Sequence, residues 1–290
     1  MQKLVAASAL FLLACLCACS KKDSNNNPSG VGIDGGTSGP SNTWLSVIVN
    51  ANIADTTVTE IHFNGDHSVS KVITASAGFP NDSTRDTIYN TIIPVYSGGN
   101  LTALQSATDT LSASGPVTTV FDYNTAGVLL RIRYFPGTTS YAYDSLVTGS
   151  GGLLATSYHY ILDSTTGALT EQYYESFTWT QKGDLQTVLV NNIDPSNGSV
   201  SSLTASYTYD GFYNPYKTVK DLPFMLGSLD NILPMLSANN VLTSQLVGFN
   251  AENSYAYQYN PNSVPSSQNI SEILQGSVKQ STFVYFQYIQ

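Results

Sequence analysis

Short runs in which apolar and polar residues alternate, separated by turn residues, begin at Trp44 and continue to the last residues of the chain. A period of two residues indicates a strand with one buried face. Thr59, Ile61 and Phe63 share such a face and lead into Asn64-Gly65, a dipeptide typical of a tight hairpin turn. The frequent Thr, Tyr, Val and Ile residues also favour strands, while the scarcity of Lys and Glu disfavours exposed helices. The chain is therefore predicted to be all-β.

The alternation predicts which residues share a face of each strand. Leu45, Val47 and Val49 are expected on one face of the first strand. In residues 128–134, the even-numbered apolar residues are expected on one face and the odd-numbered arginines on the other. The last strand, around residues 283–288, is aromatic on both faces and is expected inside the sheet or in a tight packing layer.

Residues 222–242 depart from this rhythm. Leu226, Leu229 and Leu233 keep helical spacing, and Pro234 interrupts the run. One or two short helical turns across an end of the sheet are predicted here.

A degenerate repeat organises the middle of the chain. An aromatic-x-aromatic group, a polar turn and a leucine that opens another strand recur at residues 121–129, 158–169 and 177–185, with partial copies at 207–211 and 255–260. A strand, a turn and a return strand occupy about 20 residues, so each copy is expected to be a hairpin. The prediction for residues 44–290 is a single antiparallel β-meander of repeated hairpins, forming an open sheet, a sandwich or a barrel.

The N-terminus has the form of an export signal. Lys3 is followed by an uncharged apolar stretch, residues 4–18, which is shorter than a membrane-spanning helix. The segment Leu16-Cys17-Ala18-Cys19 resembles the lipobox of bacterial lipoproteins. The resemblance implies cleavage after residue 18 and acylation of Cys19 by diacylglycerol and palmitate-type chains, which anchor a protein firmly in a membrane. The alternative is an ordinary signal peptide with incidental cysteines.

The residues after Cys19 indicate where the anchored chain is sorted. Ser20, the residue after the cysteine, favours sorting to the outer membrane. Lys21-Lys22-Asp23 loosely resembles the tag of surface-exposed lipoproteins in Bacteroidota. Residues 19–43 are rich in Ser, Asn, Gly and Pro and are interpreted as a flexible, lipidated tether.

The Tyr-x-Tyr-Asp…Gly…Leu pattern, seen at residues 207–211 and in the other copies, resembles the YD repeats of Rhs-type proteins in degenerate form. Together with the lipobox, it is similar to Bacteroidota outer-membrane lipoproteins that carry a domain of unknown function with a porin-like fold. The resemblance covers roughly residues 115–265. It implies no known activity and no catalytic residues.

Composition excludes some partners and cofactors. Lys and Arg total 11, the net charge is −9, and no long basic run exists, so nucleic acid is not an expected partner. Cleavage before Cys19 leaves a single cysteine, so no disulfide within the mature chain is expected. The GxGxxG letters at residues 30–35 lie in the tether without the strand and helix of a dinucleotide site, so no cofactor is predicted.

Few residues suggest chemistry. His62 with Glu60, and His67 after the turn, could form at most a weak surface metal site, and solvated hairpin residues are the preferred interpretation. A glycan hydrolase would need two facing carboxylates. The acidic residues of the tyrosine-rich region are the candidates for such a pair, namely Asp122, Asp163, Glu171 and Glu175. No GxSxG, HExxH or phosphate-loop motif accompanies them.

A recurring tripeptide, Asp followed by Ser or Thr and then an aliphatic residue or Thr, resembles the acceptor of O-glycosylation in Bacteroidota. Its hydroxyl residues are Thr56, Ser83, Thr87, Thr110, Ser145 and Ser164. Asp and Ser or Thr are also common in turns, which is an equally good interpretation.

The sequence therefore favours a non-catalytic lipoprotein of the outer membrane with no metal and no cofactor, and exposure at the cell surface is the expectation from residues 20–23. Its expected role is a binding or accessory module whose Tyr and Trp residues contact a glycan or an envelope protein. A structural or assembly role without a small ligand is the alternative, and a glycan-active hydrolase is a further one.

Overall fold

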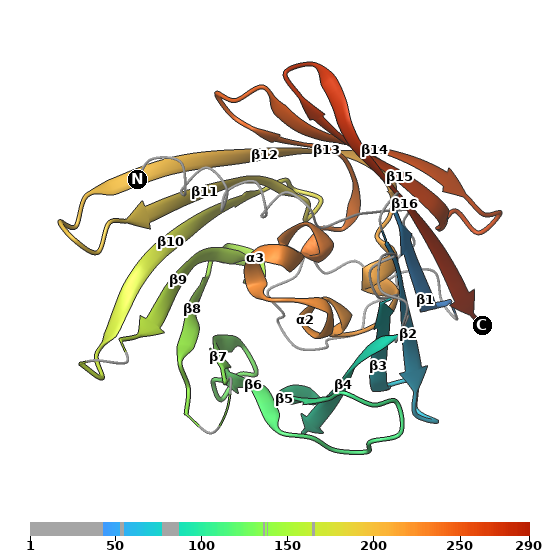
Figure 1. The fold of residues 1–290 in the computed structure, drawn as a ribbon, viewed down its shortest axis with the longest axis horizontal. Helices are drawn as coiled ribbons and strands as arrows, with labels where there is room; N and C mark the ends of the chain where they lie inside the picture. The colour runs from blue at the N-terminus through green and yellow to red at the C-terminus, as the bar shows by residue number, and fades with distance from the viewer. Residues whose placement is uncertain (1–42, 53–54, 77–86, 136, 138, 164–165) are drawn as a thin grey trace.

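The computed structural model describes residues 43–52, 55–76, 87–135, 137, 139–163 and 166–290. Within these residues, sixteen antiparallel strands form one closed barrel (Figure 1). Each strand pairs with its neighbours in sequence, and β1 pairs with β16 to close the ring. The predicted all-β antiparallel meander is confirmed, and of the three forms considered it is the barrel.

The described strands run in chain order around the ring. They are β1 Trp44–Ala51, β2 Thr56–Phe63, β3 Val69–Ser76, β4 Ile88–Ser97, β5 Asn100–Ala107, β6 Val117–Tyr123, β7 Leu129–Tyr134, β8 Ala142–Thr148, β9 Leu154–Leu162, β10 Leu169–Trp179, β11 Leu185–Ile193, β12 Val200–Tyr213, β13 Asn239–Leu246, β14 Ala251–Tyr259, β15 Pro265–Leu274 and β16 Ser277–Ile289. The short helices are η1 Ser150–Gly152, η2 Pro215–Thr218, α2 Leu222–Leu226, α3 Leu229–Ile232 and η3 Leu233–Leu236. Among the residues that the structure describes, no helix is long and apolar enough to cross a bilayer.

The core lies inside the barrel. Alternation along each strand turns apolar side chains inward, among them Ile48 of β1, Leu104 of β5, Ile132 of β7 and Val188 of β11, all of which are buried. The repeat copies at residues 121–129, 158–169 and 177–185 contain the turns β6–β7, β9–β10 and β10–β11. Each of these turns has a glycine with positive φ: Gly127, Gly167 and Gly183.

The outer wall has two sectors of different polarity. One row of outward residues, which crosses β11 to β14, is polar, and a second row, which crosses β16 and β1 to β4, is apolar. The polar row is Thr187, Ser206, Gln245 and Glu252, and the apolar row is Tyr285, Val49, Val58, Ala75 and Tyr89.

Register shifts place some side chains on the face opposite to the predicted one. The pairing of β1 with β16 shifts between Leu45 and Val47, so Leu45 is buried inside while Val47 and Val49 lie on the partly exposed outer side. The pairing of β7 with β6 skips Leu130, which is exposed, and Leu129 is buried instead. The predictions that Leu45 shares a face with Val49, and that the even-numbered face of residues 128–134 extends to Leu130, are wrong. An extra residue in one strand reverses the alternation.

Four short helices between β12 and β13 lie inside the ring of strands (Figure 1). We call η2, α2, α3 and η3 the plug. Their residues Tyr216, Leu222, Ile232 and Leu236 are buried and belong to the same apolar cluster as the inner wall. The prediction of one or two short helical turns near residues 222–242 is confirmed, and Met225 and Met235 are buried in this cluster.

Asn214, at the junction of β12 and the plug, joins the two ends of this insertion. Its side-chain amide donates to the carbonyls of Met235 (2.8 Å) and Ser237 (2.6 Å), and its Oδ1 accepts from the backbone N–H of Tyr216 (3.0 Å). Asn214 is 0% exposed, so these bonds are shielded from water. The residue therefore fixes where the plug leaves the wall and where it returns.

Replacing Asn214 with Ala should lower the free energy of unfolding by about 3 kcal/mol, because two buried carbonyls lose their donor at about 1–3 kcal/mol each. Urea denaturation measures the loss. Asn124→Ala is the matched control, since Asn124 accepts two backbone N–H bonds in the exposed β6–β7 turn. The control should cost less than about 1 kcal/mol. Equal losses in the two variants would contradict the role assigned to Asn214.

Candidate functional site

Four tyrosines stand on the outer wall of β8, β9 and β10. Tyr143 is paired with Tyr160, and Tyr158 with Tyr174, in the register of adjacent strands. The rings stack pairwise, with centroids 4.7 Å and 5.9 Å apart. The guanidinium of Arg131 lies 4.8 Å from the centroid of the Tyr143 ring. We call these five residues the outer tyrosine face.

The stacking determines what the outer tyrosine face offers to a partner. One face of the Tyr143 ring is covered by Arg131 and Tyr160 also packs against this ring, so these rings present edges and hydroxyls outward. The hydroxyl of Tyr160 donates to Glu171 (3.1 Å). A sugar ring that stacks on an aromatic ring needs an uncovered ring face, whereas a protein partner contacts edges, hydroxyls and guanidinium groups readily.

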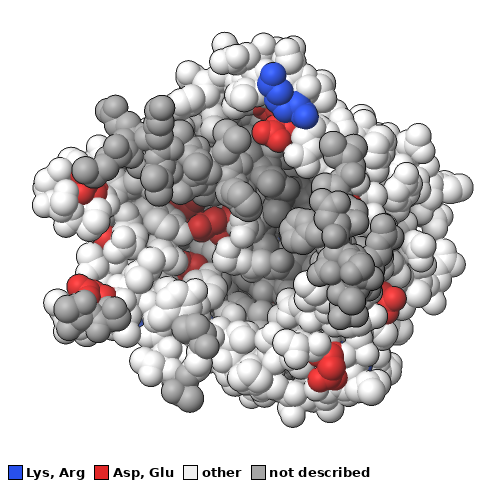
Figure 2. Space-filling model, viewed as in Figure 1, with Lys and Arg blue, Asp and Glu red and all other residues white. Residues whose placement is uncertain are grey.

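Three carboxylates gather on the opposite, inner side of the same strands. Asp144 of β8 is 3% exposed, Glu175 of β10 is 0% exposed, and Asp230 comes from α3 of the plug. We call these three residues the inner acidic cluster. Figure 2, drawn in the view of Figure 1, shows acidic side chains (red) beside the central part of this face.

Hydroxyls and one imidazole surround the inner acidic cluster. His159 Nδ1 lies 2.6 Å from Asp144 Oδ1, and Tyr134 also donates to Asp144. The Tyr173 hydroxyl donates to Asp230 (2.6 Å), which ties the plug to the wall. The rings of His159 and Tyr173 stack with centroids 4.7 Å apart. The ion pairs formed by the described residues include none between these carboxylates and a lysine or an arginine.

Glu175 is the member of the cluster whose buried carboxyl oxygens are not both hydrogen-bonded. Ser157 donates to its Oε2 (3.0 Å), but its Oε1 is buried and has no hydrogen-bond partner. Burial, and then the charges of Asp230 and Asp144, raise the pKa of Glu175 well above the ordinary value of 4.5. Burial likewise raises the pKa of Asp230. Glu175 and Asp230 therefore hold protons more tightly than free carboxylates do.

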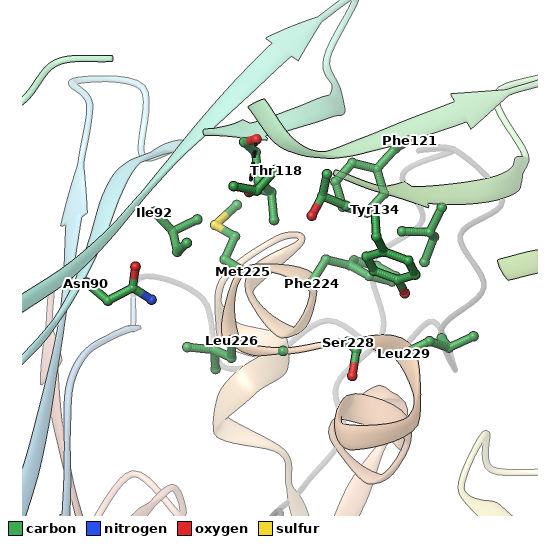
Figure 3. A pocket seen from close by; sticks show the side chains of 14 residues that line it. Asn90, Ile92, Thr118, Phe121, Tyr134, Phe224, Met225, Leu226, Ser228 and Leu229 are labelled. Atoms are coloured by element: carbon green, nitrogen blue, oxygen red, sulfur yellow. Dashed lines mark hydrogen bonds between the residues drawn. The ribbon is translucent and has the colours of Figure 1, made fainter. Parts of the chain in front are cut away.

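A pocket of about 240 Å³ lies between the plug and the inner wall of β4 to β7 (Figure 3). Phe121, Tyr134 and Phe224 gather on one side of it, with Asn90 and Ile92 on the other (Figure 3). The rings of Phe121 and Phe224 meet edge to face, with centroids 5.6 Å apart. Because the hydroxyl of Tyr134 reaches Asp144, the pocket adjoins the inner acidic cluster.

The carboxylates considered for a hydrolase do not come together as a group. Asp122 points outward and forms an ion pair with Arg133 (2.7 Å), and Glu171 is bonded to Tyr160 on the outer wall. Asp163 accepts from a backbone N–H in the β9–β10 turn. Glu175 alone faces the lumen, so the barrel wall separates it from Asp122 and Glu171.

The histidines of the first hairpin lie apart from the inner cluster. His62 Nε2 lies 3.3 Å from Glu60 on the outer wall of β2, and the ring of His67 stacks on Trp44 at 4.1 Å. Among the described residues, no group of three or more His, Cys, Asp or Glu side chains is arranged to hold a metal ion.

The predicted modification sites have different surroundings. Thr56 is the exposed first residue of β2, Thr87 is exposed directly before β4, and the carbonyl of Thr110 accepts from Lys71 (2.6 Å). Ser145 lies in the middle of β8, where it alternates with the inward-facing Asp144. Cys19, Ser83 and Ser164 lie outside the described residues. Lipidation of Cys19 and glycosylation of the six hydroxyl residues remain predictions.

The sequence interpretation missed the cluster formed by Asp144, His159 and Asp230. A signal for Asp144 was present, because strand alternation puts it between Ala142 and Leu146 on the buried face. A polar residue on an apolar face suggests a buried interaction. Asp230 lay in a helical segment whose position inside the barrel follows only from the tertiary structure.

Comparisons with known proteins give structural neighbours only. No family model matches the chain, and no curated protein matches it. A porin-like protein from Bacteroides uniformis ATCC 8492 is similar, with a TM-score of 0.47, 12% identity, and coverage of 84% of this chain and 96% of that chain. A porin-like protein from Bacteroides vulgatus ATCC 8482 has a TM-score of 0.36, 11% identity, and coverage of 85% and 98%. At these TM-scores neither likeness carries weight for function.

Glu175→Gln should change how stability depends on pH. Because the pKa of Glu175 is higher in the folded than in the unfolded chain, the folded chain keeps a proton that the unfolded chain loses above about pH 4.5. The stability that this carboxyl contributes is fully present below that pH and is lost as pH rises through the folded value. The variant should therefore gain relative to the wild type as pH rises, measured as the difference in melting temperature.

Asp194→Asn serves as the control for this experiment. The hydroxyl and backbone of Ser196 lower the pKa of Asp194 in the exposed β11–β12 turn. Removal of the Asp194 carboxylate should have a weak effect of the opposite sign, so that the melting temperature of the variant falls relative to the wild type as pH rises. A constant difference between Glu175→Gln and the wild type from pH 4 to pH 8 would contradict the burial argument.

Proposed function

We propose that the chain is a non-catalytic binding module, held at the outer membrane by lipid on Cys19, whose outer tyrosine face docks a protein partner. The stacked Tyr and Arg residues of β7 to β10 support this proposal most directly. Tyr and Arg are enriched at protein interfaces and at their energetic centres. Here they are held in place by the barrel wall, so little side-chain entropy is lost on binding.

A glycan is the second candidate ligand, and the geometry favours it less. The rings of Tyr143 and Tyr160 face each other, and Arg131 lies over Tyr143. Stacking of a sugar on these rings would require the pairs to separate. A purely structural role without a partner remains the alternative class.

The barrel is proposed to stand in water beside the membrane rather than inside it. Barrels that span outer membranes carry an apolar band around the outside and a polar interior. Here the interior holds the apolar cluster. The apolar outer row across β16 and β1 to β4 does not continue around the ring, because the outer row across β11 to β14 is Thr187, Ser206, Gln245 and Glu252. A lipid anchor on Cys19 would then supply the membrane attachment that the barrel wall does not.

The docking proposal predicts that Arg131→Ser with Tyr160→Ser weakens partner binding. The full chain, carrying Cys19→Ser so that it stays unlipidated, is immobilised and exposed to solubilised envelope proteins of its host. A retained protein, identified by mass spectrometry, is then titrated against each variant, and at least a tenfold loss of affinity is expected, since interface hot spots are each worth about 2 kcal/mol or more.

Tyr285→Ser is the matched control, because Tyr285 is also a tyrosine on the outer wall, 49% exposed, on β16. It should bind like the parent. Binding that is unaffected by the double variant, or lost equally in the control, would contradict docking at the outer tyrosine face. Saturable binding on a glycan array that is lost in the double variant would favour the glycan instead.

The lipid anchor gives a separate prediction. In the host, labelled palmitate should appear on the wild-type chain and be absent from Cys19→Ser, because the thiol forms the thioether with the diacylglyceryl group that carries the acyl chains. Gel fluorography after immunoprecipitation measures the label. Label that persists in Cys19→Ser would contradict the anchor without touching the docking proposal.

A further inference from the structure

The pocket beside the plug has an apolar body, and Tyr134 is the polar residue of its lining that contacts the inner acidic cluster. Phe121, Ile132 and Phe224 line its body, and Tyr134 and Leu229 stand where β7 meets α3. Figure 3 shows Tyr134 and Leu229 on the same side of the pocket as Phe224. At about 240 Å³ the pocket lies below the usual range for drug-sized ligands, roughly 300–1,000 Å³, and suits a one-ring molecule.

The polar residue Tyr134 connects the pocket to the carboxylates of the inner acidic cluster. The Tyr134 hydroxyl donates to Asp144, and Asp230 directly follows the pocket residue Leu229. No lysine or arginine of the described residues pairs with either carboxylate, and His159 is the one side chain capable of positive charge that contacts them. Glu175, fully buried beside them, has an oxygen without a hydrogen-bond partner. Among the described residues, the basic side chain bonded to the cluster is therefore His159, and no lysine or arginine forms an ion pair with it.

We propose that the pocket binds a small organic ammonium ion. Its apolar part would lie against Phe121 and Phe224, and its cationic end would face Tyr134 with Asp144 and Asp230 behind it. Opposite charges attract more strongly in a poorly screened interior than in water, and aromatic faces attract cations. The site would exclude carboxylates for the same electrostatic reason.

An organic cation suits the pocket better than a metal ion does. Among the described residues, no three acidic, His or Cys side chains converge on a common point. A metal ion needs such a set of ligands, whereas an ammonium group needs one or two acceptors and tolerates an apolar neighbour. The pocket supplies the apolar walls and the hydroxyl of Tyr134, and the carboxylates behind this hydroxyl supply the negative charge.

Three probes of equal size separate charge from shape: phenethylamine, phenethyl alcohol and phenylacetate. Isothermal titration of the full chain carrying Cys19→Ser should show that phenethylamine binds roughly tenfold or more tightly than phenethyl alcohol, with no detectable binding of phenylacetate. Equal affinity for the three probes, or no binding of phenethylamine at millimolar concentration, would overturn the proposal.

Two kinds of variant locate the effect. Asp230→Asn should weaken phenethylamine about tenfold and leave phenethyl alcohol unchanged, while Glu252→Gln, which removes one charge from the outer wall of β14, should affect neither. Ser228→Trp, at an exposed residue on the rim of the pocket, should abolish binding of both probes by filling the space.

Asp144→Asn provides a second test of charge if Asp230→Asn disturbs the plug, and circular dichroism checks that each variant folds. Amine binding that survives both Asp→Asn changes at full strength would overturn the role of the cluster. Amine binding that survives Ser228→Trp would place the site elsewhere and overturn the assignment to this pocket. The outer tyrosine face is untouched by all these changes, so the docking proposal stands or falls separately.

Discussion

The width of a sixteen-stranded ring is the constraint on which the rest of this structure depends. In barrels of this size the side chains of the wall do not meet across the lumen, and an aqueous channel remains unless another element enters it. Here the plug enters, and its buried residues Tyr216, Leu222 and Ile232 complete the apolar cluster that lines the wall. Apolar side chains on the inner face of the strands are kept from water because the helices of the plug cover them. Asn214 holds the insertion at the point where it begins and ends.

The plug also creates the candidate ligand site. The helices of the plug leave a pocket between themselves and the inner wall of β4 to β7. One of them, α3, places Asp230 within hydrogen-bond distance of Tyr173. The inner acidic cluster therefore combines residues from two strands of the wall and one helix. A wall of strands alone would bring Asp144 and Glu175 into the lumen but would leave it open to water. Burial, and then the charge of Asp230 on the plug, raise the pKa of Glu175.

Local pattern predicted the strands and the hairpins because alternation and turn residues act over a few positions. Gly127 and Gly183 mark turns whose backbone requires positive φ, and both turns were expected. The faces of individual strands were less predictable, because Leu45 and Leu129 lie next to register shifts that depend on the neighbouring strand. The inner acidic cluster could be inferred only in part. Alternation marks Asp144 as inward, but its meeting with Tyr134 and His159 depends on the pairing of three strands.

The seam between β1 and β16 has a consequence for how the barrel is made. Every other pairing joins strands that follow one another in the chain, so these pairings can form from contacts that are local in the sequence. The pairing of Ile48 with Phe286 joins residues that are nearly a whole chain length apart, and such contacts are slow to form because a long loop must be closed first. Until the final strand has emerged from the ribosome, β1 presents an unpaired edge, the kind of surface on which chains stick to one another. A chain of this design therefore has its greatest need of a holding chaperone before its last residues are available.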